Sequence, residues 1–300
     1  QMEYLMKKFL AVTVFLMFIM ILPAVAKDYT VDYLDGYLDI KDGGEWYELI
    51  IGEVVTENDT IRLDEDSVVE LAAQGTKLTL TKPGVYVIAD LLKASGESRS
   101  VGLASVIGSK IKSILEEPKQ TQTAVMGVRG AKSDDELEWM SGDTAELLKS
   151  GKEFLSEGEY ADAVGVLEEA YDFADEAEEG EVLFFLSFAN ALMGELRVAI
   201  ESLNYVEPDP ESEFFTDLIL LKGQLLTETF AYQEAAEWLS QYESDLAGDD
   251  AATQMSLLLQ GISHKGLGNI NDAKQSLQKA VNLGSSSEAG VAAQDILNNL

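Results

Sequence analysis

The sequence predicts two folded parts of different class: a small antiparallel β sandwich or barrel, followed by an all-α array of helical hairpins, an α-solenoid. The chain has 300 residues, enough for two domains. From about residue 29 to residue 92, apolar residues alternate with a period of two, which is typical of strands. From about Asp143 the period becomes that of a helix, and a pattern of small residues repeats.

The amino-acid composition excludes several classes of function. Hydrophobic residues make up 46% of the chain and charged residues 25%, which is ordinary for a globular protein. The formal net charge is −33, so the chain repels phosphate backbones and anionic lipids, and we expect no nucleic-acid partner. There is no cysteine, which excludes disulfides and thiolate metal sites, and His264 is the single histidine. We therefore expect neither a cofactor nor a metal.

Residues 1–26 have the pattern of a secretory signal peptide. Lys7 and Lys8 precede an uninterrupted apolar run from Phe9 to Leu22, and Ala24-Val25-Ala26 is a small-x-small cleavage site. We expect cleavage before Lys27 and a periplasmic or secreted protein without stable membrane insertion. The alternative is an uncleaved anchor, but the apolar run is shorter than the ~20 residues that span a bilayer.

Residues 27–131 are assigned to the β domain. Alternating runs occupy residues 28–33, 37–40, 60–63, 68–71, 77–80 and 85–88. Turn-forming residues separate them at 41–44, 57–59, 64–67, 74–75 and 82–84. A polar stretch at 94–100 then leads to a helical insertion at about 101–117, which Pro118 ends. Residues 121–130 return to strand character and are expected to be a late strand of the same domain.

Three segments resemble FecR-type domains. Leu49–Val55 and Asn58–Arg62 are similar to the family's "l..Gd.v..gd.i.T" core, and Asp66–Leu71 is similar to its "s.v.l" strand. Ala124–Gly130, with Gly127, Val128, Arg129 and Gly130, resembles its "vaGVRGT" strand, although Ala131 replaces the threonine. The resemblance implies an exported all-β module of the kind found in periplasmic regulators. The chain lacks the internal membrane helix of a transmembrane sigma regulator, so that activity is not expected.

Residues 132–142 are expected to be a linker, and residues 143–300 to hold four helical hairpins and a final helix. A leading alanine recurs at nearly equal intervals, at Ala163, Ala199, Ala235 and Ala273. A small residue precedes each of them at a constant distance, at Gly151, Ser187, Gly223 and Gly261. The turn between the two helices of each unit falls at Gly158, Gly194, Phe230 and Gly268. This spacing resembles the tetratricopeptide repeat (TPR), in which small residues let helix A approach helix B closely.

No catalytic motif occurs. The acidic clusters lack the ligand spacing of a calcium loop and are expected to be solvated faces or turns. His264 is expected to be a packed or partly exposed helical residue and not a catalytic base. Arg129 either pairs with a carboxylate in its strand or contacts a ligand.

In a TPR-like array the A helices line a concave groove, and the segment from Val182 to Met193 is apolar almost all round. The expected groove residues are Leu148, Lys152, Leu155, Phe184, Phe188, Leu192, Leu220, Gln224, Thr227, Met255, Leu258 and Ile262. One interpretation is an open groove that binds an extended or helical peptide, with Phe184 and Phe188 exposed. The other is that residues 94–142 or the final helix cover this face.

Residues 141–300 contain 7 Lys and Arg against 31 Asp and Glu, a net charge of −24, so the partner should be neutral or basic. The sequence as a whole favours an exported, non-enzymatic adaptor that binds a protein or peptide in the cell envelope. Two alternatives stay open: a sensor whose β domain binds a small ligand or wall polymer, and an enzyme accessory or hydrolase. The change of period near residues 132–143 further predicts two separate cores, each able to fold alone.

Overall fold

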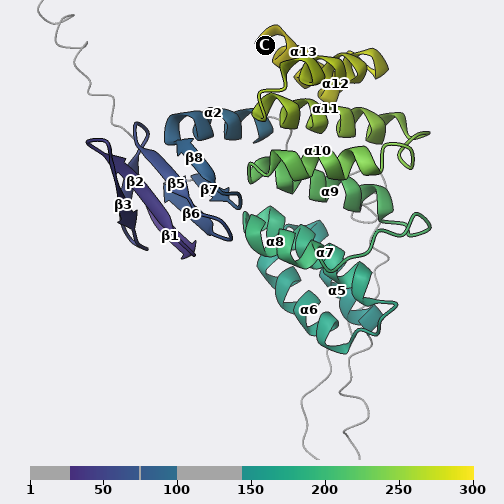
Figure 1. The fold of residues 1–300 in the computed structure, drawn as a ribbon. Coiled ribbons are helices and arrows are strands. Elements are labelled where there is room, and N and C mark those ends of the chain that lie inside the picture. The colour runs from purple at the N-terminus through teal and green to yellow at the C-terminus, as the bar shows by residue number, and fades with distance from the viewer. Residues whose placement is uncertain (1–27, 74–75, 100–143) are drawn as a thin grey trace, which may run out of the picture.

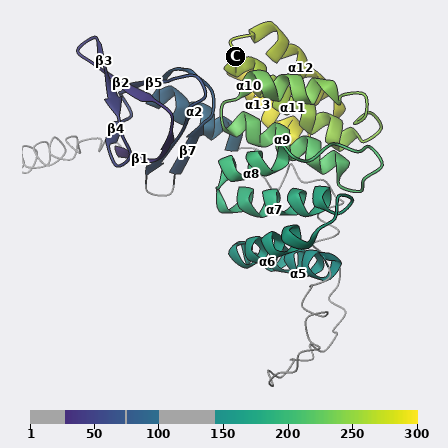
Figure 2. The same cartoon turned by 60° about the horizontal axis from the view of Figure 1, so that its bottom comes forward.

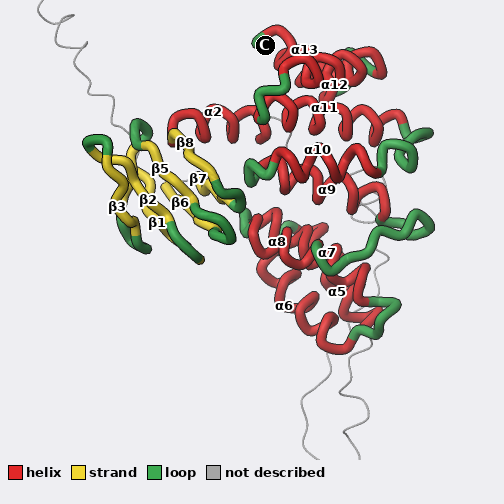
Figure 3. The backbone as a smooth tube through the Cα atoms, in the orientation of Figure 1, coloured by secondary structure: helices red, strands yellow, loops and turns green. Residues whose placement is uncertain are grey.

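The computed structural model describes residues 28–73, 76–99 and 144–300. In these ranges the chain forms a two-sheet β region followed by a helical region, so the predicted fold class is confirmed at that level (Figure 1, Figure 3). The strands are β1 (Asp28–Asp35), β2 (Leu38–Asp42), β3 (Glu45–Leu49), β4 (Val54–Thr56), β5 (Thr60–Leu63), β6 (Val68–Ala73), β7 (Thr76–Leu80) and β8 (Gly84–Val87). The helices are α2 (Ile88–Arg99), α5 (Thr144–Glu157), α6 (Tyr160–Phe173), α7 (Glu179–Met193), α8 (Leu196–Leu203), α9 (Phe215–Glu228), α10 (Tyr232–Gln241), α11 (Asp250–Gly266), α12 (Ile270–Leu283) and α13 (Glu288–Asn298). No helix within these ranges is long and apolar enough to span a membrane.

Residues 28–99 form the β module, in which two antiparallel four-stranded sheets enclose one core. The strand orders are β4-β1-β6-β7 and β3-β2-β5-β8. Alternate residues of each strand point inward, so that Tyr29, Val31 and Leu71 of the first sheet are buried with Leu38 and Ile61 of the second. The period-two runs predicted most of these strands.

The alternation does not reveal the edge strands β3 and β4, although it does reveal the other two edge strands, β7 and β8. Each pairs with a single neighbour, β3 with β2 and β4 with β1. In β3 only Leu49 is buried, and its other residues are at least partly exposed. Strand β4 has only three residues, of which Val55 is buried, and so short a run shows no period.

Helix α2 begins earlier than the sequence predicts. The run at 85–88 ends as a strand at Val87, and the polar stretch from Ala94 onward is helical as far as Arg99. Two hydrogen bonds hold the start of α2, from Ile88 N to Asp59 O and from Ala89 N to Glu57 O. The side chains of Ile88 and Leu91 are buried in the β core, which stabilises a helix of weak intrinsic pattern. The predicted insertion at 101–117 and the strand at 121–130 lie outside the described residues.

Residues 144–300 form the repeat array. The helix pairs α5/α6, α7/α8, α9/α10 and α11/α12 are four successive hairpins, and α13 packs on the last of them (Figure 1). The hairpins are stacked one on the next, and the β module lies at one side of the stack (Figure 2). Each hairpin alone leaves an apolar face open, and its neighbours bury it.

Glycine and leucine determine the spacing of helices within the hairpins. A Cβ atom built on Gly151, Gly223 or Gly261 would lie 2.6, 2.6 or 2.5 Å from the nearest atom of Leu167, Leu239 or Leu277, respectively. Each of these leucines is fully buried. The leucine of helix B therefore packs directly against the glycine of helix A, as the repeat spacing predicts. We call this contact the glycine seat.

The turn between helices A and B requires a left-handed backbone. The value of φ is +79° at Gly158, +82° at Gly194 and +75° at Gly268. In the third hairpin Phe230 has the same conformation, with φ of +62°. A residue with a side chain loses roughly 1–2 kcal/mol in this region of φ and ψ relative to its ordinary conformation, so another contact must hold Phe230 there.

The glycine seat predicts opposite effects for two glycine substitutions. Gly261→Ala places a methyl group against Leu277, and we expect a loss of about 1–3 kcal/mol in the free energy of unfolding from overpacking. Gly165→Ala is the matched control, because nothing lies within 4 Å of its added Cβ in helix α6. It should stabilise the protein by up to ~1 kcal/mol through helix propensity. Urea denaturation measures both, and equal effects at the two positions would contradict the seat.

Candidate functional site

The residues expected to line a concave groove lie on the A helices, but most of them are buried. Leu148, Lys152 and Leu155 are on α5, Phe184, Phe188 and Leu192 on α7, Leu220, Gln224 and Thr227 on α9, and Met255, Leu258 and Ile262 on α11. Only Lys152 and Leu192 among them are half-buried; the others are buried, and Phe184 and Phe188 are 0% and 1% exposed. The expectation of an open aromatic groove is therefore wrong.

Helix α7 is apolar all round because it has neighbours all round. It contacts α5 and α6 on one side and α8 and α9 on the other. Phe214, from the loop before α9, stacks on Phe184 with ring centroids 5.0 Å apart, and Phe185 meets Phe184 edge-on at 5.1 Å. The sequence pattern that was interpreted as a binding face belongs to a core helix.

The A helices of the third and fourth hairpins also contact each other. Thr227 Oγ1 of α9 and Ser263 Oγ of α11 are buried 3.3 Å apart. Helix α2 of the β module packs against both α9 and α11. These contacts belong to α2 as a whole, so the covering of the A helices by residues 94–142 stays an interpretation.

The remaining candidate residues form no site in the described part of the chain. The FecR-like residues Gly127, Val128, Arg129 and Gly130 lie outside the described residues. His264 lies on α11 and is neither fully buried nor exposed. In the described ranges, no group of three or more His, Cys, Asp or Glu side chains is arranged to hold a metal ion.

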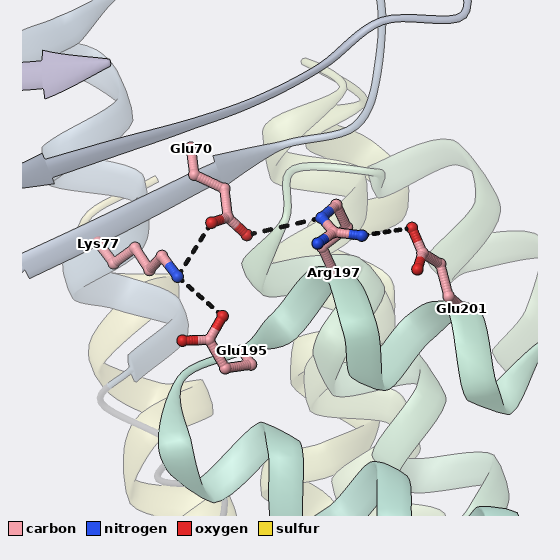
Figure 4. A network of polar contacts seen from close by, with 5 residues as sticks. All are labelled: Glu70, Lys77, Glu195, Arg197 and Glu201. Carbon is pink, nitrogen blue, oxygen red and sulfur yellow. Dashed lines mark hydrogen bonds and ion pairs between the residues drawn. The ribbon is translucent and has the colours of Figure 1, made fainter. Parts of the chain in front are cut away.

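The structure brings together a set of charged residues that the sequence did not reveal, at the junction between the β module and the repeat array. Lys77 of β7 lies 2.9 Å from Glu70 of β6 and 2.9 Å from Glu195, the residue before α8. Arg197 of α8 lies 4.0 Å from Glu70 and 2.8 Å from Glu201 (Figure 4). Glu70 is 4% exposed, so its carboxylate is removed from water and depends on these cations.

Further contacts extend the junction on both sides. The guanidinium of Arg197 lies 4.4 Å from the ring centroid of Tyr33 on β1, in cation–π geometry. Lys82, which follows β7, forms an ion pair with Glu234 of α10. The β module is therefore attached to the second hairpin through α8 and to the third through α10.

Phe230 supplies the apolar anchor of the junction. It is 6% exposed and belongs to the core cluster of the β module, together with Ile88 and Leu91. The ring of Tyr232 meets it edge-on at 6.0 Å. This burial offsets the backbone strain at Phe230 and explains why glycine is absent from this turn alone. It also corrects the prediction of two separate cores, because the β core includes a side chain of the array.

The ion pairs alter the titration of the two cations. Burial alone would lower the pKa of Lys77, but hydrogen bonds to Glu195 and Glu70 outweigh it and raise the pKa above the ordinary 10.5. The stability from these contacts is thus present below pH 10.5 and is lost as the pH rises through the raised pKa of Lys77. Burial also opposes the charge of Arg197, but the hydrogen bond to Glu201 and the negative charges of Glu201 and Glu70 together outweigh it, so the pKa of Arg197 is raised.

Comparisons with known proteins give a partial likeness. No protein-family model and no curated protein sequence matches the chain. Among solved structures, the MamA RS-1 ArsTM double mutant is similar at 21% identity and a TM-score of 0.45, over 53% of this chain and 84% of that one. MamA 41-end from Desulfovibrio magneticus RS-1 is similar at 19% identity and a TM-score of 0.42, over 53% of this chain and 94% of that one.

Burial of the aromatic residues on α7 predicts a large loss of stability on truncation. Phe184→Ala removes a side chain stacked on Phe214 and leaves a cavity, so the free energy of unfolding should fall by about 3–5 kcal/mol. Phe173→Ala is the control, because Phe173 ends α6 with 44% of its surface exposed, and its loss should stay below ~1 kcal/mol. Thermal and urea unfolding compare them, and similar losses would contradict the core assignment.

The junction predicts a difference between two lysines of the β module. Lys77→Met removes the nearer of the two cations beside the buried Glu70 and leaves Arg197, and we expect a loss of about 2 kcal/mol in the free energy of unfolding. Lys82→Met breaks an ion pair whose side chains are 38% and 48% exposed, and it should cost about 1 kcal/mol or less. Urea unfolding at pH 7 measures the difference, and equal losses at the two lysines would contradict the dependence of the buried Glu70 on Lys77.

Proposed function

We propose that this protein is an exported, non-enzymatic adaptor whose TPR-like repeat array binds a protein partner in the cell envelope. The observation that carries the proposal is the junction. The ion pairs of Lys77 with Glu195 and of Arg197 with the buried Glu70, together with the buried anchor Phe230, hold the β module on the second and third hairpins. Two surfaces held in one orientation by a buried contact are what an adaptor needs in order to bring partners together.

Charge supports the same proposal and describes the partner. The half of the chain that contains the array has a net charge of −24, which favours a neutral or basic protein and disfavours nucleic acid. Long-range attraction of this kind is screened by salt, so capture should weaken as the ionic strength increases. The proposed β module is FecR-like, and the proposed location, the periplasm or outside the cell, rests on the signal-peptide pattern of residues 1–26.

A second candidate function is favoured by the same junction. Because the β core shares Phe230 with the array, a ligand that altered the β module would act on the turn of the third hairpin. This arrangement fits an envelope sensor or regulator in which the β module binds a small ligand or wall polymer and the array transmits the change.

Site-specific photo-crosslinking in the native host tests the adaptor function. A photoreactive amino acid replaces Tyr205 of the array, which is 78% exposed, or Tyr37 of the β module, which is 64% exposed. We expect a crosslinked polypeptide from Tyr205 in the envelope fraction, reduced at high salt. Absence of any crosslinked protein from Tyr205 and from Val291, also exposed on the array at 57%, would contradict the proposal. A mature N-terminus at Lys27, read by mass spectrometry, tests the export.

A further inference from the structure

A groove opens between α10 and α11, on the hairpin boundary next to the junction. Its volume is about 500 Å³, and it is open to solvent. Helix α10 contributes Gln233, Ala236 and Glu237, and helix α11 contributes Gln260 and His264. No sequence pattern indicates this groove, and none of the expected groove residues lines it.

One residue of the groove lining has a smaller side chain than its equivalents in the first two hairpins. Ala236 follows the leading alanine of its B helix, and the equivalent residues of the first and second hairpins are Val164 and Ile200. Both of these larger side chains pack against the core of the array. The single methyl group of Ala236, which lines the groove, occupies less space than either of these side chains.

The wall of the groove carries unused hydrogen-bonding capacity. His264 Nδ1 is shielded from solvent, and it has no hydrogen-bond partner within the described ranges of the chain. Gln260 is 6% exposed, and its amide nitrogen makes one long hydrogen bond, 3.3 Å, to Ser256 Oγ. Gln241 and Asn269 add two further primary amides to the lining. The shielded Nδ1 of His264 cannot reach a ligand directly, so the exposed amides of Gln233, Gln241 and Asn269 are the groups that a ligand would meet.

The side chains that line the groove favour some classes of ligand over others. A primary amide both donates and accepts in one plane, as a peptide group does, so Gln and Asn pair well with a polypeptide main chain. The described lining residues include no Lys or Arg to bind phosphate and no Trp, Tyr or Phe on which a sugar ring could stack. Glu237 is their one carboxylate, and it would attract a basic side chain.

We propose that the α10–α11 groove binds an extended, polar or basic segment of a partner polypeptide, mainly through the main chain of that segment. The inference rests on the proposed adaptor function and names the site and the class of ligand. An apolar helix is disfavoured, because Ala236 and Leu267 are the only apolar residues in the described lining.

A groove-filled variant tests the proposal. Ala236→Ile restores the residue that the second hairpin has at this position, and it fills the groove with a side chain that the fold already accommodates there. Random dodecapeptides displayed on phage are selected on the full-length protein and counter-selected on Ala236→Ile. Selected peptides are synthesised, and their affinities are measured by fluorescence polarisation. We expect polar or basic peptides that bind Ala236→Ile about tenfold or more weakly than the unmodified protein.

Two further variants keep the test decisive if Ala236→Ile folds poorly. Glu237→Lys reverses an exposed charge on the groove and should also weaken these peptides about tenfold, whereas Asp245→Lys, an exposed charge outside the lining, should not. Peptides that bind all variants equally, or no enrichment over the filled protein, would overturn the proposal. Crosslinking of a partner from Tyr205 that persists unchanged in Ala236→Ile would overturn the groove while leaving the adaptor function standing.

Discussion

A carboxylate that leaves water needs cations at close range, and Glu70 obtains them from both parts of the chain. Lys77 comes from its own sheet, and Arg197 comes from helix α8 of the repeat array. Lys77 forms the close ion pair at 2.9 Å, and docking adds the charge of Arg197 at 4.0 Å on the other side of the carboxylate. The contact of α2 with α9 and α11, and the inclusion of Phe230 in the β core, belong to the same docked arrangement. One buried charge and one aromatic anchor thus fix how the two parts lie.

The repeat array depends on regularity, and its two clearest departures from regularity lie in the third hairpin. Three of the four turns use glycine at the left-handed position, whereas the third uses Phe230. The residue after the leading alanine is branched in the first two hairpins, a lysine in the fourth and Ala236 in the third, where the side chain is smallest. Each departure costs stability locally: Phe230 has a strained backbone conformation, and Ala236 has a smaller side chain for packing. Departures of this kind are expected where a protein uses its surface.

Features that depend on residues close together in the sequence could be predicted from it, and features that depend on distant residues could not. Strands with one buried face, and helix pairs joined through a glycine seat such as Gly261 and Leu277, follow from local periodicity and were predicted. Edge strands β3 and β4 lack the alternation, and α2 is stabilised by tertiary contacts, so the pattern missed them. The burial of Phe184 depends on Phe214 from the next hairpin, and the pairing of Glu70 with Arg197 joins segments that are remote in the sequence. A local periodicity does not indicate such contacts. The sequence does show that Phe230 stands where the other hairpins have glycine.

The third hairpin also joins the junction to the α10–α11 groove. Tyr232 begins α10, packs against the β core and lies over Gly266 of α11, where an added Cβ would come within 2.3 Å of the tyrosine ring. The next residue, Gln233, already lines the groove. One short stretch of chain therefore touches the β module with one residue and the groove with the next. Because α10 is anchored at this end, a polypeptide in the groove would meet a wall that the docked β module holds in place. Preorganisation of that kind reduces the entropy lost on binding, which gives the β module a physical role in recognition without contacting the partner.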